Sequence, residues 1–216
     1  MGASENFYER YWRDGADTYS GDHQGYAVHF RKWMADVIPG LGKNPRILEV
    51  GCGDASFTKS LSTFSERVTG IDISEAQIAI NAHKYPEIAF VPHDISTTLP
   101  FDTDSFDLVW CSEVLEHLYE PGFALQEAHR VLRPGGMLMV TVPYHGLFKN
   151  LCIVLFRWDR VFDPEGPHVR FFTRKSLVRL AVKADFKNIV VKTCGANRLL
   201  VDLCFSSNIL LQATAS

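Results

Sequence analysis

The chain has 216 residues, of which 46% are hydrophobic and 22% are charged, and its formal net charge is −3 at pH 7. This length is enough for one sizeable hydrophobic core, and we expect a single domain over residues 1–216. The small negative charge disfavours nucleic acid as a partner, because binding phosphates requires a surplus of basic residues.

The five cysteines, which are Cys52, Cys111, Cys152, Cys194 and Cys204, are widely spaced and form no Cys-x-x-Cys pair. Their spacing predicts neither a zinc site nor a disulfide framework, and no metal ion is expected. The N-terminal residues lack the apolar core of a secretory signal, and the longest strongly apolar run, 147–156, is too short to span a bilayer. We therefore expect a cytoplasmic protein with no stable membrane span.

Short apolar runs alternate with segments of helical periodicity, which is typical of an α/β fold with a mainly parallel sheet. An N-terminal cap, 1–45, should hold two helices, one of them at 25–37. Five strand-and-helix units follow in 46–143, then an insertion at 144–172 and a C-terminal helix with two strands at 173–216. The strands are expected at 46–50, 67–71, 88–91, 106–111, 137–142, 188–193 and 208–213, and the remaining helices at 55–64, from 74, at 121–132 and at 173–184.

Two local patterns refine these boundaries. Ser74 and Gln77 have the spacing of a capping box, in which the serine accepts from the third backbone N–H and the glutamine side chain reaches back. The run Arg133-Pro134-Gly135-Gly136 predicts a break between the helix at 121–132 and the next strand.

The turn after the first strand reads Glu49-Val50-Gly51-Cys52-Gly53-Asp54, and the second strand is followed by Asp72. Glycines let the backbone approach a ligand, and a carboxylate at Asp72 can accept both hydroxyls of a ribose. A dinucleotide would place its pyrophosphate beside Glu49 and Asp54, at about 3–4 kcal/mol for each like-charge pair ~4–6 Å apart. S-adenosylmethionine carries no phosphate but an ammonium and a sulfonium, so the charges favour this methyl donor over a nicotinamide cofactor.

The runs ILEVGCGDASFT, GIDIS, PHDI, FDLVWCSEVLEHL and VLRPGGMLMVTVP follow one another over 47–143, and HVRFFTRKSLVRL extends the pattern to about 180. They resemble the motifs of class I S-adenosylmethionine-dependent methyltransferases, in particular type 11 and ubiquinone-biosynthesis methyltransferases. This resemblance implies a Rossmann-like three-layer αβα sandwich with a seven-stranded, mainly parallel sheet whose last strand is antiparallel. Ala55 departs from the pattern, since many relatives have a third glycine there.

The resemblance further implies a site for S-adenosyl-L-methionine, with S-adenosyl-L-homocysteine as the product. Glu49, Gly51 and Gly53 would line the methionine half of the donor, the two glycines through their backbone. Asp72 would bind the ribose hydroxyls, and Ile73 would pack on the adenine.

At the next two strand ends, Asp94 would accept from the adenine amino group with Ile95 beside it. Cys111 and Ser112 would contact the ribose and methionine through their backbone. Outside the motif, Asp94 would be read as a loop residue, and Ile95, like Ile73, as core.

Three histidines are candidates for the acceptor side, because imidazole can take a proton near neutral pH. His117 follows the fourth strand, His145 follows the fifth, and His168 lies in the insertion. Each could instead be a partly exposed polar residue or a helix cap. A base is needed only where the attacking atom carries a proton, as in a hydroxyl.

The run at 147–156 is apolar almost all round, which favours a buried helix. The functional alternatives are a lid over an apolar acceptor, or a surface that touches a membrane or a partner.

We expect an enzyme that methylates a small, partly apolar molecule, with oxygen favoured over nitrogen or carbon as the methyl acceptor. One alternative is a nicotinamide-dependent oxidoreductase, which the acidic turn disfavours. The other is a non-catalytic subunit that binds the methyl donor. Either a monomer or a homodimer is consistent with the sequence.

Overall fold

The computed structural model describes Glu9 and residues 26–144, 147–156, 158–162, 167–194 and 208–216. Their centre is a seven-stranded sheet with the order β3-β2-β1-β4-β5-β7-β6. Neighbours from β3 to β5 are parallel, whereas β7 runs antiparallel to both β5 and β6. The strands are β1 (Ile47–Val50), β2 (Val68–Asp72), β3 (Ala89–Pro92), β4 (Phe106–Ser112), β5 (Leu132–Pro143), β6 (Lys187–Cys194) and β7 (Asn208–Thr214). The predicted Rossmann-like sheet with an antiparallel last strand is confirmed.

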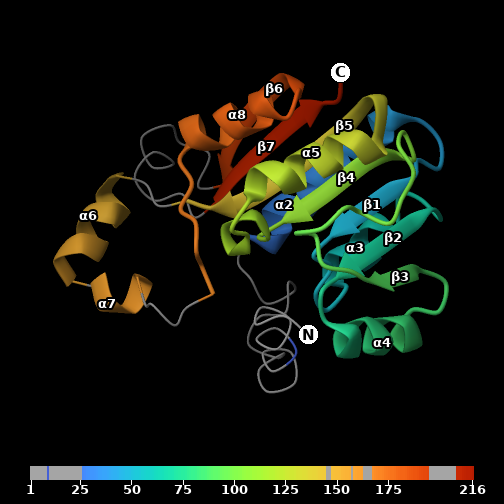
Figure 1. Ribbon diagram of the computed structural model, residues 1–216, viewed down its shortest axis with the longest axis horizontal. Helices are drawn as coiled ribbons and strands as arrows, with labels where there is room; N and C mark the ends of the chain where they lie inside the picture. The colour runs from blue at the N-terminus through green and yellow to red at the C-terminus, as the bar shows by residue number, and fades with distance from the viewer. Residues whose placement is uncertain (1–8, 10–25, 145–146, 157, 163–166, 195–207) are drawn as a thin grey trace.

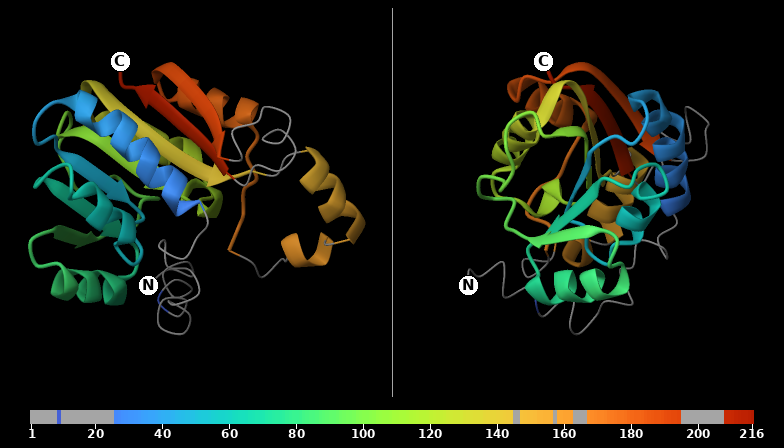
Figure 2. Two further views of the ribbon diagram at one scale, coloured as in Figure 1. Left: turned by 180° about the vertical axis from the view of Figure 1, so that it is seen from behind. Right: turned by 90° about the vertical axis from the view of Figure 1, so that its right-hand side faces the viewer.

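Helices cover both faces of the sheet, so the fold has three layers (Figures 1 and 2). One face carries α5 (Pro121–Val131) and α8 (Arg174–Lys183), which pack against each other. The opposite face carries α2 (Ala27–Val37) and α3 (Ser56–Leu61), and α4 (Glu75–Lys84) packs beside β2 and β3. The α/β assignment from alternating periodicity is therefore correct.

The two faces of the sheet bury separate hydrophobic clusters. The cluster under α5 and α8 includes Val109 and Val140 from the central strands. The cluster under α2 and α3 surrounds Trp110, whose ring contacts Phe30 at a centroid distance of 6.2 Å and Trp33 at 5.6 Å. The alternating orientation of side chains along β4 thus places neighbouring residues in opposite layers of the fold. The same alternation sets the direction of the side chains at the end of the strand.

The predicted break at 133–136 is wrong, because β5 already begins at Leu132. The partner of Phe106 on β4 is Leu132, but the partner of Leu108 is Met137, so the extra residues form an irregularity within the pair. Gly135 adopts φ +76, and its N–H donates to the Ala215 carbonyl at 3.1 Å. The glycines therefore bend the strand without ending it.

The capping box at Ser74 is only half correct. The Ser74 hydroxyl accepts from the Gln77 backbone N–H at 3.2 Å, but the Gln77 side chain donates to Asn81 at 3.0 Å instead of reaching back. The Ser74 N–H donates to Asp72 at 3.1 Å, so that carboxylate has taken the place of the glutamine. Thr173, by contrast, forms the complete box with Ser176.

Residues 26–45 form one α-helix, α2, followed by the 3₁₀ turn η3 (Ile38–Leu41). The other predicted N-terminal helix lies outside the described residues.

The insertion forms α6 (Leu147–Phe156) and the short α7 (Trp158–Val161), which extend away from the sheet (Figure 1). Ile153 is 5% exposed, but Val154 is 56% and Phe156 is 79% exposed. The expectation of a buried helix is therefore wrong, because an apolar surface on all sides can be buried only where other elements surround it. No helix among the described residues is both long and apolar enough to cross a bilayer.

Candidate functional site

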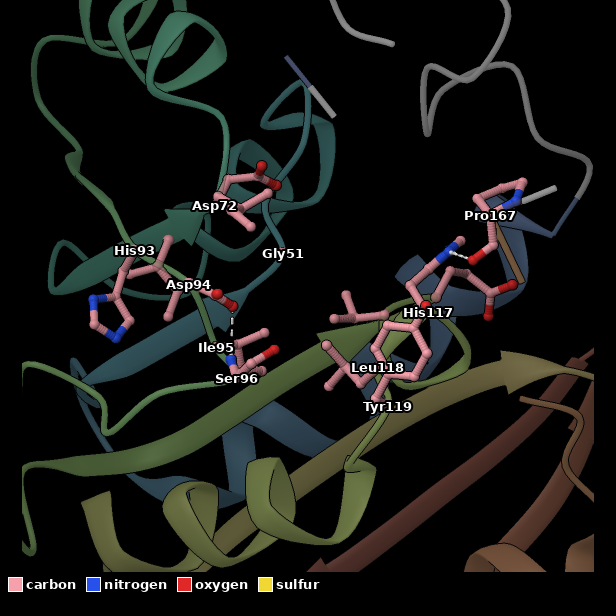
Figure 3. Close-up of a pocket in the computed structure, with 14 residues that line it drawn as sticks. Gly51, Asp72, His93, Asp94, Ile95, Ser96, His117, Leu118, Tyr119 and Pro167 are labelled. Carbon is pink, nitrogen blue, oxygen red and sulfur yellow. Dashed lines mark hydrogen bonds between the residues drawn. The ribbon is translucent and has the colours of Figure 1, made fainter. Parts of the chain in front are cut away.

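A cavity opens at the carboxyl ends of β1, β2, β3 and β4, where open α/β sheets bind their ligands (Figure 3). Six residues expected from the sequence line it, namely Gly51, Asp72, Ile73, Asp94, Ile95 and His117. It is also lined by eight residues that the sequence did not single out, which are Ile71, His93, Ser96, Glu113, Val114, Leu118, Tyr119 and Pro167.

The turn after β1 depends on the glycine at position 51. Gly51 adopts φ +72, and its N–H donates to the Ile71 carbonyl of β2 at 2.8 Å. A Cβ atom at this position would lie 2.3 Å from Cγ2 of Val114. Both the backbone conformation and the contact with the β4 end therefore require glycine, and the cavity floor is bare backbone here.

Asp72 anchors this turn as well as facing the cavity. One carboxylate oxygen accepts from the Gly53 N–H at 3.0 Å, and the other accepts from the Ser74 N–H at 3.1 Å. Asn81 of α4 closes the turn from behind by donating to the Gly53 carbonyl at 2.7 Å. Gly53 and Asn81 do not line the cavity, so their role is to hold its wall. No sequence pattern pointed to Asn81.

Two buried acids, Glu49 and Asp72, lie at the turn beside the cavity. Glu49 of β1 is buried, and its Oε2 has no hydrogen-bond partner among the described residues. Burial raises the pKa of Glu49 well above its ordinary value, and the nearby Asp54 and Asp72 carboxylates raise it further. Burial also raises the pKa of Asp72. A cation bound in the cavity would offset both shifts, whereas an anion would increase them.

The end of β3 supplies the side of the cavity opposite His117 (Figure 3). Asp94 lines the cavity, and its Oδ1 accepts from the Ser96 N–H of its own loop at 2.8 Å. Ile95 lines the cavity while packing against the hydrophobic core. Asp94 is thus a loop residue and Ile95 a core residue, and both also line the cavity.

The end of β4 differs from expectation. Cys111 and Ser112 do not line the cavity: Cys111 is buried in the core, and the Ser112 hydroxyl bonds to that of Thr141 at 2.8 Å. Glu113 lines the cavity instead, in the left-handed conformation with φ +55. Such backbone strain outside glycine persists only where the surrounding structure enforces it.

The carboxylate of Glu113 is held on both oxygens. Oε1 accepts from the Thr141 hydroxyl of β5 at 2.8 Å, and Oε2 accepts from the Asn208 side chain of β7 at 2.8 Å. Burial nevertheless raises the pKa of Glu113, because the buried surroundings disfavour the charged form of its carboxyl group.

Beyond Glu113, the 3₁₀ turn η4 (Leu115–His117) carries a second buried acid and a candidate histidine. Burial raises the pKa of Glu116 well above its ordinary value, and the nearby Glu113 raises it further. Burial lowers the pKa of His117 to about 4, so its imidazole is neutral at physiological pH.

The insertion brings His168 to His117. The two rings pack edge to face with a centroid distance of 4.8 Å, and burial lowers the pKa of His168 as well. Segment 167–170 is tied to the η4 turn by the Val169 and Arg170 N–H groups, which both donate to the Glu116 carbonyl at 2.9 Å. Two of the three candidate histidines thus meet, while His145 lies outside the described residues.

His168 also lines a second cavity, whose walls are mainly aromatic. Its lining consists of Pro143, Tyr144, Asn150, Phe162, His168, Arg170, Phe171, Phe172 and Thr173. Since His117 lines the first cavity and touches His168 of the second, the histidine pair marks the boundary between an acidic and an aromatic chamber.

Comparisons with known proteins agree with this geometry. Residues 48–140 match the model of a family described as a methyltransferase domain. The chain is 34% identical over 199 residues to a demethylmenaquinone methyltransferase of Staphylococcus epidermidis, covering 82% of this chain and 83% of that protein. It is also 33% identical over 141 residues to the 27-O-demethylrifamycin SV methyltransferase of Amycolatopsis mediterranei, covering 62% of this chain but only half of that longer relative.

Among solved structures, the fold is similar to the N-methyltransferase NodS of Bradyrhizobium japonicum in complex with S-adenosyl-L-homocysteine. The TM-score is 0.70 at 18% sequence identity, with 99% of each chain covered. At this identity the likeness shows that the two chains share a fold.

Proposed function

Because this chain belongs to the S-adenosylmethionine-dependent methyltransferases, we propose that it methylates an oxygen atom of a small, partly aromatic or apolar molecule. The observation that supports this proposal is the boundary described above, where an acidic donor chamber and an aromatic chamber meet at His117 and His168.

For the donor, we propose that the turn at Gly51 and Gly53 receives the methionine half and that the Glu49 carboxylate stabilises its positive charge. Asp72 binds the ribose hydroxyls with the lone pairs left after its bonds to Gly53 and Ser74. The proposed adenine pocket is lined by Ile73 on one side and by Ile95 with Asp94 on the other. Under this proposal Cys111 and Ser112 support the cavity wall and do not contact the donor.

For the acceptor, we propose the aromatic chamber, because Phe171, Phe172 and Tyr144 offer flat apolar surfaces to a ring system. Oxygen is favoured because the carboxyl and imidazole groups at the boundary can orient an acceptor hydroxyl toward the donor. The rifamycin relative is named for an oxygen-bound methyl group, which agrees with this choice. A quinone precursor is one candidate, since the staphylococcal relative is named for a quinone.

Two measurements test this proposal. Calorimetry should detect binding of S-adenosylmethionine and no binding of NAD, since the acidic turn repels a pyrophosphate. Incubation with methyl-labelled donor and a panel of hydroxylated aromatics, aryl amines and carbon acids should then label the hydroxylated compounds. Binding of NAD would contradict the donor assignment, and labelling confined to amines or carbon acids would contradict the choice of oxygen.

The non-catalytic alternative predicts donor binding without methyl transfer to any acceptor. The second chamber argues against it, because a subunit that only binds the donor needs no cavity beyond the boundary histidines. We also propose a cytoplasmic location, since Cys52, Cys111 and Cys152 are free thiols, as a reducing compartment would keep them. A monomer and a homodimer both remain consistent with these features.

A further inference from the structure

Three side chains from two distant segments meet at the boundary between the chambers. Glu116 and His117 come from the η4 turn and His168 comes from the insertion, and one ligand atom of each lies within 4.8 Å of the others. Nε2 of His117 lies 3.7 Å from Oε1 of Glu116. None of these residues is a cysteine, which is why the wide cysteine spacing gave no indication of such a group.

The surroundings of the Glu116 carboxylate indicate that a partner is missing. Glu116 is 2% exposed, and neither of its carboxylate oxygens has a hydrogen-bond partner among the described residues. Buried carboxylates are normally paired with a charge, hydrogen-bonded, or bound to a metal ion. The His117 nitrogen at 3.7 Å is the closest approach that the carboxylate makes to a polar side chain of this group, and it is too long for a hydrogen bond.

The orientation of His117 agrees with a ligand role. Its Nδ1 lies 3.0 Å from the Pro167 carbonyl oxygen, and a carbonyl can only accept, so Nδ1 carries the proton. The lone pair is then on Nε2, the nitrogen on the side of Glu116. Histidine ligands of metal ions typically donate their other ring N–H to a backbone carbonyl in this way.

We infer that Glu116, His117 and His168 bind a divalent transition-metal ion at the boundary between the donor and acceptor chambers. Two imidazoles and one carboxylate form the donor set of catalytic zinc sites, which keep one coordination position open. The same set accepts other first-row divalent ions, whereas Mg²⁺ and Ca²⁺ prefer oxygen ligands alone. Ligand atoms about 2.0–2.1 Å from a tetrahedral ion lie roughly 3.4 Å apart, so the group needs to contract by at most about 1.4 Å.

The use of such an ion rests on the proposed function. His117 lines the donor cavity and His168 the aromatic one, so the open position faces the place where the two substrates meet. A Lewis acid there would polarise the acceptor hydroxyl and fix its oxygen in line with the methyl carbon. The O–H proton then passes to water, the oxygen forms a bond to the methyl carbon, and the C–S bond breaks with its electron pair staying on sulfur.

The experiment uses the full chain stripped with a chelator and titrated with Zn²⁺, Co²⁺ or Mg²⁺ alone. Calorimetry follows all three ions, and visible absorption follows Co²⁺. We expect one equivalent of Zn²⁺ or Co²⁺ to bind, with Co²⁺ bands of a nitrogen- and oxygen-ligated site, and Mg²⁺ to bind far more weakly. Binding of no transition metal by the wild-type protein would overturn the inference.

Variants locate the ion. Glu116→Gln and His168→Asn should each weaken Co²⁺ binding by at least about tenfold, while His168→Asp, which supplies another ligand, should keep binding with shifted bands. His93→Asn is the matched control, because His93 lines the same donor cavity outside the group and should bind Co²⁺ as the wild type does. Undiminished binding in His168→Asn would overturn the inference even if Glu116→Gln fails to fold. Donor affinity, measured without metal, separates this outcome from failure of the proposed function.

Discussion

Nδ1 of His117 donates to the carbonyl oxygen of Pro167, 50 residues further along the chain, across 3.0 Å. This bond joins the end of β4 to the insertion and thereby sets the position of His168 against His117. Apart from Pro167, the residues that line the donor chamber belong to the Rossmann-like core, whereas the boundary with the acceptor chamber exists only where the insertion docks.

The docking can be tested through Arg170, whose guanidinium donates to the Tyr119 carbonyl at 2.7 Å. Arg170→Ala removes this bond, which is worth about 0.5–1.5 kcal/mol, and should lower turnover by roughly twofold to tenfold. Donor affinity measured by calorimetry should not change, because the donor cavity lacks Arg170. Arg174→Ala is the control, since it removes a similar bond, to the Val191 carbonyl, away from both chambers. Equal turnover in the two variants would contradict the docking role.

Gly51 and Gly135 share a positive φ, +72 and +76, but only Gly51 lies against another side chain. The left-handed backbone alone should cost about 1–2 kcal/mol of unfolding free energy for alanine at either position, and Gly51→Ala should cost more because its Cβ clashes with Val114. Only Gly51→Ala should also push Val114 from its place and weaken donor binding, by at least about tenfold. Chemical denaturation and calorimetry of both variants check this. Donor affinity as high in Gly51→Ala as in Gly135→Ala would show that the contact with Val114 is unimportant.

Asp72→Asn tests the double role of this carboxylate. The amide keeps one acceptor for the N–H groups of Gly53 and Ser74 but loses the charge and presents a donor to the other. Losing one charge-assisted bond, worth about 1.5–3 kcal/mol, should weaken donor binding about tenfold to a hundredfold. Asp102→Asn, on the exposed loop before β4, should bind the donor like the wild-type protein. Unchanged affinity in Asp72→Asn would exclude the ribose contact.

Glu49 should give opposite pH dependences of stability and of donor binding. Because its folded pKa is raised, the folded apo protein holds this proton longer than the unfolded chain does, so stability falls as pH rises from 4.5 through the folded pKa. Over the same range donor affinity should rise, because the ionised carboxylate attracts the cationic donor.

Glu49→Gln should therefore flatten the pH dependence of the apo melting temperature and weaken donor binding at neutral pH. Thermal denaturation with and without donor, from pH 4.5 to 8, measures both effects. Glu66→Gln, at an exposed position before β2, serves as the control. Donor affinity that falls with rising pH in the wild-type protein would contradict the charge argument for the whole turn.

The elements that could be predicted from the sequence are those whose structure depends on the residues within them and next to them. Strands β1, β2 and β4 read as apolar runs because both faces of the sheet are covered. The glycine turn and Asp72 were predictable because the turn chemistry is local, with Gly51 at a positive φ and Asp72 bonded to the next turn.

The predictions that failed concern parts of the protein whose structure depends on contacts between distant segments. Glu113 gave no local signal, because its orientation is fixed by Thr141 and Asn208, 28 and 95 residues away. The exposure of helix α6 could not be predicted, because composition shows how apolar a helix is but not whether other elements surround it. His168 was named as a candidate, but its pairing with His117 becomes visible only when the insertion folds back.

The bond from Asn208 to Glu113 has a consequence for how an active molecule is made. Strand β7 lies between β5 and β6 and is the last strand to be synthesised. The sheet is therefore completed, and Glu113 gains this bond, only after β7 has left the ribosome. Glu113 is therefore held on both carboxylate oxygens only once β7 has been synthesised and has paired with β5.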